Sequence, residues 1–221
     1  VPATRHLAAD RDDLTLVHVT HFNRLFWESG RTRTEVIEHG IVDPGHRFTG
    51  RLARAAVVVN EPVRRGRTTG TDLLPLLAEA APLDVFGMGT ERLAGHLGLS
   101  PERCRTADLP QAQLHSALAE RRVYLHPVRW TSLGLSLLEA MHLGMPVVAL
   151  ATTEVVRAVP PGAGVLSTRP EELAAAVRRY LADPGAAAAD GLAARQAALR
   201  AYGLKRFLAD WDRLIEEVTQ W

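Results

Sequence analysis

Residues 125–150 decide the fold, and they read LHPVRWTSLGLSLLEAMHLGMPVVAL. Residues 123–126, immediately before Pro127, predict a strand, and the run over residues 135–143 predicts a helix. Gly144 ends this helix, and the apolar run over residues 146–150 predicts the next strand. A strand, a helix and a second strand in this order are typical of a parallel sheet.

The same alternation extends through most of the chain, so the sequence predicts the α/β fold class. Further strands are expected at residues 14–19, 35–37, 55–60, 83–86 and 164–166. Further helices are expected at residues 72–80, 91–97, 111–119, 171–182, 186–202 and 204–221. Seven strands at irregular spacing fit one open sheet that is buried on both faces.

Composition and charge exclude several classes of protein. The 221 residues are 47% hydrophobic and 23% charged, which excludes a largely disordered chain. A formal net charge of +1 predicts no whole-molecule attraction to nucleic acid or to an anionic membrane. The sequence contains no apolar run of the roughly 18–20 residues that span a bilayer and no signal-peptide pattern, so we expect a cytoplasmic protein. Abundant alanine, and Lys205 as the single lysine, indicate a GC-rich bacterial genome.

The helix that begins near Gly134 is a candidate phosphate site. Its first turn follows the carboxyl end of a strand and offers free backbone N–H groups and the positive end of the helix dipole. Glu139 lies one and a half turns further along, among apolar residues. A bare buried carboxylate costs on the order of several kcal/mol, so Glu139 needs a partner or a function. The alternative is a Glu139 side chain that faces solvent on an otherwise buried helix.

Residues 125–150 also resemble a motif of the retaining GT-B glycosyltransferases of family 4, the "glycosyl transferases group 1" set. The positions shared with that motif are Gly134-Leu135, Leu138-Glu139-Ala140-Met141, Gly144 and Pro146-Val147-Val148-Ala149. The resemblance implies the C-terminal, donor-binding half of a GT-B fold, which is a Rossmann-like parallel sheet flanked by helices.

In that family, two glutamates separated by seven residues bind the donor sugar nucleotide. The resemblance implies that Glu139 is the second of them and accepts hydrogen bonds from ribose hydroxyls. The first falls on Thr131, which has no carboxylate, so the sequence departs from the family pattern there. The backbone N–H groups of Gly134 and Leu135 would hold the diphosphate.

A second family landmark is an arginine and a lysine on the loop that follows the first strand of this domain. Residues 60–74 read NEPVRRGRTTGTDLL, in which Arg64 stands at the arginine position and Thr69 at the lysine position. Arg65 or Arg67 would have to supply the missing charge. We expect Arg64 and Arg67 to stabilise the diphosphate leaving group and Arg65 to bind the donor, because guanidinium groups pair bidentately with phosphate. The alternative is a solvated basic loop.

Two glycines extend the resemblance. Gly87 and Gly89 follow a predicted strand, as a Gly-x-Gly does in the family, and would let the backbone approach a nucleotide. Arg92 replaces the third glycine of the dinucleotide fingerprint, so NAD is not expected.

The resemblance covers nearly the whole chain and implies three parts. Residues 1–48 would be a remnant of the N-terminal acceptor domain with a linker, and residues 49–202 the Rossmann-like domain that binds a nucleotide sugar. Residues 203–221 would be an amphipathic helix that packs toward the N-terminal domain. Its apolar stripe consists of Leu204, Phe207, Leu208, Trp211, Leu214, Ile215 and Val218. Most of the acceptor domain is missing before Val1, so we expect the stripe to bind that domain or to drive self-association.

The sequence therefore predicts the donor-binding domain of a retaining glycosyltransferase that uses a nucleoside-diphosphate sugar, such as a UDP or GDP sugar, and an unidentified acceptor. We expect this chain alone to be inactive without the N-terminal half. No cofactor and no metal are expected, because the histidines and Cys104 show no metal-ligand spacing. The alternative, favoured by Thr131 and Thr69, is a non-catalytic nucleotide-binding or interaction module with a degenerate fold. A nucleotide-sugar epimerase of the same architecture is a further alternative.

Overall fold

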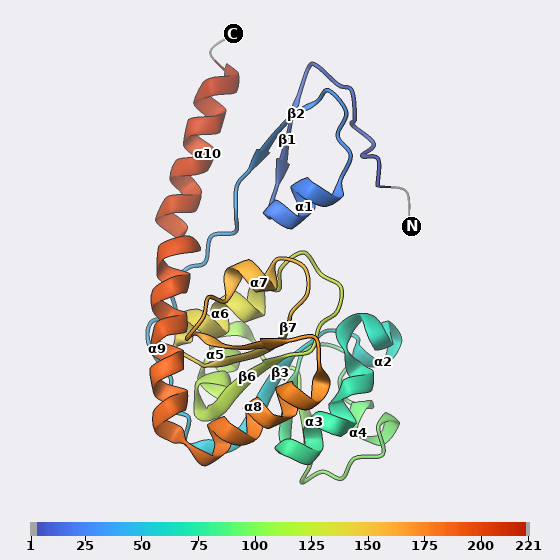
Figure 1. The fold of residues 1–221 in the computed structure, drawn as a ribbon, viewed down its shortest axis with the longest axis vertical. Helices are drawn as coiled ribbons and strands as arrows, with labels where there is room; N and C mark the ends of the chain where they lie inside the picture. Colours follow the sequence, from blue (N-terminus) through green and yellow to red (C-terminus); the bar gives the residue numbers. More distant parts are fainter. Residues whose placement is uncertain (1–3, 220–221) are drawn as a thin grey trace. The chain divides into compact units, whose positions relative to one another are not determined.

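A computed structural model describes residues 4–219 of the chain. In it, the stretch around residues 125–150 forms β6 (Arg121–His126), α6 (Leu135–Leu143) and β7 (Val147–Leu150). The helix ends where Gly144 adopts the left-handed conformation, with φ 88°. The described chain divides into two compact units, residues 43–200 and residues 4–42 together with 201–219. Figure 1 shows the elements of both units.

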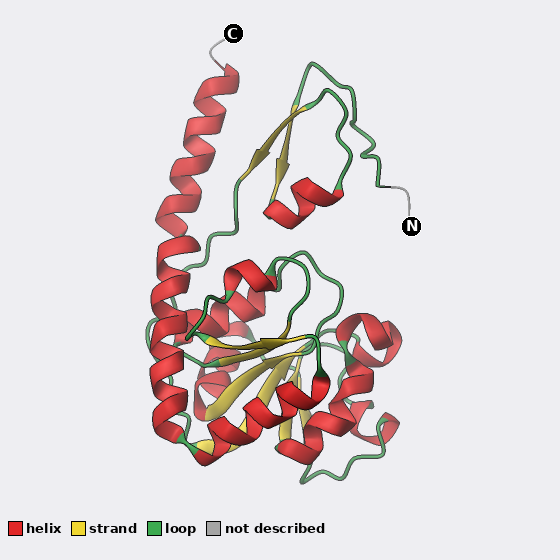
Figure 2. Cartoon of the chain, in the orientation of Figure 1, coloured by secondary structure: helices red, strands yellow, loops and turns green. Residues whose placement is uncertain are grey.

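The larger unit contains a six-stranded parallel sheet with helices on both sides (Figure 2). Its other strands are β3 (Leu52–Val58), β4 (Leu83–Phe86), β5 (Cys104–Ala107) and β8 (Gly164–Ser167). The strand order is β5-β4-β3-β6-β7-β8, and every neighbouring pair is parallel. This arrangement confirms the predicted α/β fold class.

The strand order reverses between β3 and β6. The unit begins with β3 in the middle of the sheet, adds β4 and β5 on one side, and returns to the other side of β3 as β6. In open sheets of this kind, ligands bind outside the carboxyl ends of the strands where the order reverses. The fold therefore directs attention to the loops that follow Val58 and His126.

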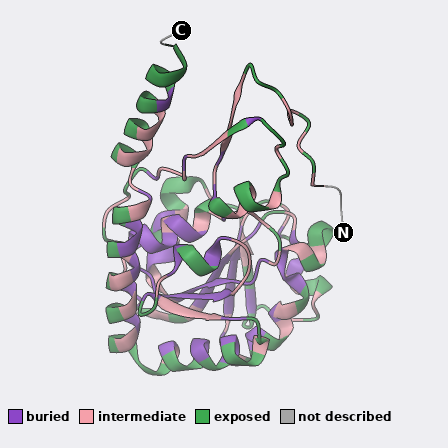
Figure 3. Ribbon diagram, turned by 45° about the horizontal axis from the view of Figure 1, so that its top comes forward, coloured by how far each residue is buried: buried purple, intermediate pink, exposed green. Residues whose placement is uncertain are grey.

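Helices cover the sheet because its strands are apolar on both faces. The helices of this unit are α2 (Pro62–Arg65), α3 (Leu74–Ala80), α4 (Leu93–His96), α5 (Gln111–Glu120), α6, α7 (Val155–Ala158), α8 (Pro170–Ala182) and α9 (Pro184–Ala201), with 3-10 turns η1 (Gly66–Thr69) and η2 (Thr71–Leu73). Helix α8 packs against α3 and against β6, β7 and β8, and α5 packs against α6. Figure 3 shows that the strands of this unit are largely buried. In β7, Val147, Val148 and Ala149 are fully buried.

The smaller unit contains a two-stranded parallel sheet of β1 (Thr15–His18) and β2 (Arg33–Val36). Helix α1 (His21–Phe26) connects them and is capped by Thr20, whose side chain accepts a hydrogen bond from Asn23 N at 3.0 Å. Helix α10 (Leu204–Thr219) completes the unit. No helix within residues 4–219 has the length and apolarity that crossing a membrane requires.

Several sequence predictions need correction. The seven predicted strands do not form one sheet, because the first two pair only with each other and β5, which was not predicted, joins the larger sheet. Strand β5 reads CRTA and lies at the sheet edge, where Cys104 is the only buried residue of its four, so it lacks an apolar run. Helix α1 was not predicted, and the segment predicted as a helix over residues 91–97 contains only the short α4. Residues 220–221 of the last predicted helix lie outside the described residues. The assignment of residues 1–48, 49–202 and 203–221 to three functional parts stays a prediction.

Candidate functional site

A cavity of about 340 Å³ lies at the carboxyl ends of β3 and β6, where the strand order reverses. Its wall comes from the end of β3, the loop with α2 and η1, the end of β6 and the beginning of α6. The lining residues are Val58, Val59, Asn60, Arg65, Thr69, His126, Val128, Thr131, Leu133, Gly134, Leu135 and Ser136. Of the predicted site residues, Arg65, Thr131, Gly134 and Leu135 are therefore brought together in one wall.

The amino end of α6 presents unpaired donors to this cavity. Gly134 is the N-cap residue and has no side-chain cap, and its carbonyl accepts from Leu137 N at 3.1 Å. Within residues 4–219, no backbone carbonyl accepts a hydrogen bond from the N–H group of Leu135 or Ser136. These N–H groups and the positive end of the helix dipole favour an anion.

The three arginines of the basic loop have different surroundings. Arg65 lines the cavity, whereas Arg64 and Arg67 do not. Arg67 donates to Asp72 at 2.8 Å, and Arg64 lies 3.6 Å from the carboxylate of Glu61. Their side chains are 78% and 72% exposed, respectively, so both are able to change partners. The sequence predicted the right loop, but only Arg65 is placed at the cavity.

Thr69, which stands at the lysine position of the family motif, has a structural role in η1. Its hydroxyl donates to Gly66 O at 3.0 Å and lies 2.9 Å from the Thr71 hydroxyl, which donates to Pro62 O at 2.7 Å. Thr69 is 2% exposed. A buried hydroxyl that bonds to the backbone holds the turn and leaves no charge at this position of the wall.

Glu139 lies outside the lining of the cavity. It follows Leu135 by one helical turn on the same side of α6, and its side chain is 14% exposed. Its Oε1 accepts a hydrogen bond from Gln111 Nε2 at 2.7 Å, and its Oε2 lies 3.5 Å from His115 Nε2. Glu139 is therefore partnered by α5 and does not project freely into solvent.

Gly87 and Gly89 have packing roles at the carboxyl end of β4. A Cβ atom on Gly87, where φ is 130°, would lie 2.3 Å from Val59 O. A Cβ atom on Gly89, where φ is 69°, would lie 3.0 Å from the carboxyl group of Glu61. The two glycines allow the loops after β3 and β4 to approach each other, and neither residue lines the cavity.

His126 and Asn60 line the cavity but were not predicted as site residues. Asn60 orients the neighbouring loop, because its Oδ1 accepts from Met88 N at 3.0 Å. His126 is 2% exposed, and burial lowers its pKa to about 4. The available signal was their position, because His126 ends one apolar strand and Asn60 shortly follows another. Ligands of open sheets bind at this end of the strands. Residues 4–219 contain no group of three or more potential metal ligands.

A match between the sequence and a family model establishes the family to which the chain belongs. Residues 64–183 match the family described as Glycosyl transferases group 1, and this match covers more than half of the chain. The chain belongs to this family, and its fold is that of GT-B glycosyltransferases. No curated protein sequence matches the chain.

Solved structures show the same fold at low sequence identity. Sucrose-phosphate synthase from Thermosynechococcus elongatus has a TM-score of 0.78 and 20% identity, with 92% of this chain and 58% of that chain covered. HepE from Anabaena, in complex with UDP and glucose, has a TM-score of 0.76 and 16% identity, with coverage of 90% and 62%. The pneumococcal O-GlcNAc transferase GtfA, in complex with UDP and GlcNAc, has a TM-score of 0.74 and 15% identity, with coverage of 93% and 45%. The chain thus spans less than two thirds of each of these proteins.

Proposed function

We propose that this chain is the donor-binding part of a retaining glycosyltransferase that takes a sugar from a nucleoside-diphosphate sugar. The observation that carries the proposal is the cavity at the carboxyl ends of β3 and β6, which is lined by Arg65 and by the first residues of α6. Backbone N–H groups at a helix end and a guanidinium group are the usual partners of phosphate. Transfer also requires an acceptor site, which we place in a further part of the enzyme.

The position of Glu139 suits a nucleoside diphosphate bound in this way. With the diphosphate at Leu135, a ribose one helical turn away would reach the carboxylate of Glu139, because residues four apart on a helix have Cβ atoms about 5–6 Å apart. A carboxylate accepts two ribose hydroxyls well. Binding would require Gln111 to share or release its hydrogen bond to Glu139.

Catalysis would be electrostatic. Arg65 and the N–H groups of α6 would stabilise the negative charge that develops on the departing diphosphate. Arg64 and Arg67 would join them by leaving Glu61 and Asp72, since their exposed side chains cost little to reorient. We propose no metal ion and no other cofactor for this role. HepE and GtfA each have a solved complex with UDP, which makes UDP sugars the first donors to test.

Calorimetric titration with UDP, GDP, ADP and dTDP tests the proposal. We expect one of them to bind, and Arg65→Ala and Glu139→Ala each to weaken that binding about tenfold, since hydrogen bonds to charged groups contribute about 1.5–3 kcal/mol. The control Arg178→Ala removes an exposed arginine of α8 outside the cavity and should bind like the wild type. EDTA should leave the affinity unchanged. No binding by a folded sample, or equal binding by both site variants, would contradict the proposal.

A second candidate function is a non-catalytic nucleotide-binding or interaction module. The observation that favours it is the neutral pair Thr69 and Thr131, which both line the cavity where the family motifs have charged residues. A chain of this kind binds the nucleotide but releases no sugar from the donor. Measuring sugar transfer and donor hydrolysis, with the acceptor-binding part supplied in trans, separates the two functions.

A further inference from the structure

His126 is a buried polar residue whose ring nitrogens have no hydrogen-bond partner within residues 4–219. It closes β6, is 2% exposed, and lies in the wall of the cavity. Neither Nδ1 nor Nε2 has a hydrogen-bond partner among residues 4–219. The Tyr124 ring stacks nearby, with ring centroids 6.1 Å apart, and satisfies neither nitrogen. Buried polar groups are nearly always hydrogen-bonded, so the imidazole is placed for a partner from outside the chain.

The groups around His126 indicate the chemistry of that partner. The pKa of His126, lowered to about 4 by burial, leaves the ring neutral at pH 7, with one N–H donor and one acceptor nitrogen. The charged residue that shares the wall is Arg65, and the backbone N–H groups of Leu135 and Ser136 are also donors. No carboxylate of the described residues lines the cavity. A wall built from donors suits an anion rich in acceptor oxygens.

His126 lies against the amino end of α6. A Cβ atom added to Gly134 would come within 2.8 Å of His126 Cε1 and 3.4 Å of His126 Nε2. The glycine therefore allows the ring and the helix end to adjoin. A single group bound at this helix end is within reach of both.

We propose that His126 is a further ligand-contacting residue, whose imidazole donates one N–H to a phosphate oxygen of the nucleoside diphosphate held at the amino end of α6. This inference rests on the proposed function and deepens it, because it adds a hydrogen-bond donor to the phosphate that comes from β6. The role requires no change of charge on the ring. It predicts that His126 contributes to binding the diphosphate and not the nucleoside.

Nitrogen-15 NMR of the histidine side chains tests this inference on the wild-type protein. Titration with the nucleoside diphosphate that binds in calorimetry should shift the His126 ring resonances, and the matching nucleoside should not shift them. His126→Leu should lower the diphosphate affinity about tenfold. His126→Asn, which keeps a donor, should lower it less. The affinity for the nucleoside should be the same in all three proteins.

His142→Leu is the matched control. His142 is fully buried and also has an unpartnered Nε2, but it does not line the cavity. This variant should bind the diphosphate like the wild type, with thermal melting used to verify folding. If folded His126→Leu binds the diphosphate as tightly as the wild type, the inference is wrong. If that variant does not fold, the wild-type NMR titration decides.

The two proposals fail in different ways. If the wild type binds no nucleoside diphosphate, the proposed function fails, and inorganic pyrophosphate becomes the NMR probe. A pyrophosphate-induced shift of the His126 resonances would still support the phosphate contact. Unchanged resonances would overturn it.

Discussion

At the residue scale, His126 makes the stability of the larger unit depend on pH. Its pKa falls from an ordinary 6.5 to about 4 in the folded chain, so the unfolded chain binds more protons between these values. Keeping His126 neutral therefore contributes to the free energy of unfolding. This contribution is fully present above pH 6.5 and is lost as the pH falls toward 4, by roughly 3 kcal/mol if the whole shift is realised. Denaturant unfolding between pH 7 and pH 4 should show this loss, and His126→Leu should flatten it.

Part of the pH dependence should survive in that variant. Burial also lowers the pKa of His142, which lies in the same unit and acts in the same direction. Identical slopes for the wild type and His126→Leu would show that His126 titrates normally in the folded chain.

At the scale of elements, a buried cluster of charged residues links β3, β4 and β6 near their amino ends, whereas the cavity lies at the carboxyl ends. Asp84 of β4 accepts hydrogen bonds from Arg54 Nε of β3 and Arg121 Nε of β6, both at 2.6 Å, and its side chain is 3% exposed. Asp84→Ala leaves two largely buried guanidinium groups without their carboxylate, and we expect a loss of about 3 kcal/mol in the free energy of unfolding. Thermal melting should detect this, since each kcal/mol lowers the Tm of a chain of this size by roughly 2–4 °C.

Asp72 provides the matched control for this prediction. It also binds two arginines, Arg129 and Arg67, but its side chain is 34% exposed. Exposed ion pairs contribute about 0–1 kcal/mol, so Asp72→Ala should change the Tm little. Equal effects of the two variants would contradict the argument from burial.

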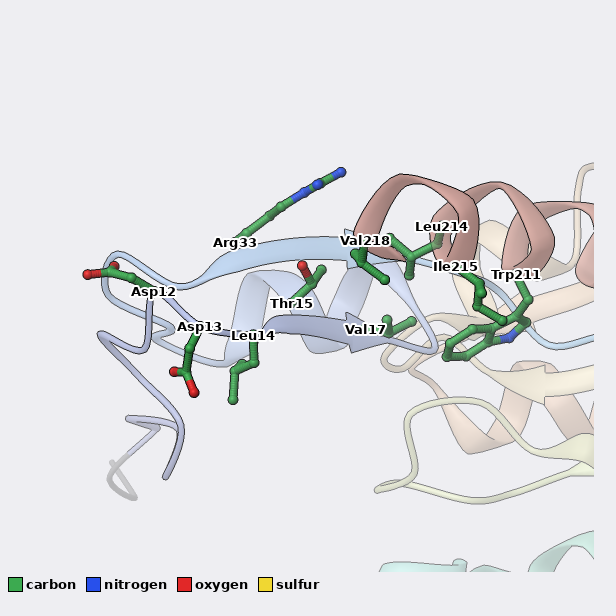
Figure 4. A pocket seen from close by; sticks show the side chains of 10 residues that line it. All are labelled: Asp12, Asp13, Leu14, Thr15, Val17, Arg33, Trp211, Leu214, Ile215 and Val218. Atoms are coloured by element: carbon green, nitrogen blue, oxygen red, sulfur yellow. The ribbon is translucent and has the colours of Figure 1, made fainter. Parts of the chain in front are cut away.

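At the scale of the whole molecule, the two units differ in the core that each contains. Strands β6 and β7 lie within a large buried core, whereas no described residue of α1 is buried and Leu214 is the only buried residue in the described part of α10. The smaller unit instead has a cavity of about 670 Å³, lined by residues that include Trp211, Ile215, Val218 and Val17 (Figure 4). A two-stranded sheet with so little core is marginal in water.

Hydrogen exchange should reveal this difference. We expect the amides of β1 and β2 to exchange roughly a hundredfold faster than those of β6 and β7, because local opening is easiest where few apolar contacts are broken. Peptide-resolved mass spectrometry measures both sets in one sample. Equal protection of the four strands would mean that the two units unfold as one.

The sequence by itself determined the order of strands and helices over residues 125–150 and the bounds of α6. It did so because hydrophobic periodicity and a glycine cap are local signals. It also identified Arg65, Thr131, Gly134 and Leu135, which the fold brings into one cavity wall. The resemblance to the glycosyl transferases group 1 is confirmed by the match of residues 64–183. Membership of family 4, the assignment to a C-terminal half, a retaining mechanism and the individual roles of the site residues stay predictions.

Only the tertiary structure decided which side chains meet. It placed His126 beside Gly134, turned Glu139 toward Gln111, and paired Arg67 with Asp72. It also decided that β5 completes the larger sheet while β1 and β2 pair separately. These outcomes depend on which strand lies next to which and on the partners brought by distant segments. Periodicity along the chain does not encode such pairings, because each is settled by hydrogen bonding, burial and charge in the folded molecule.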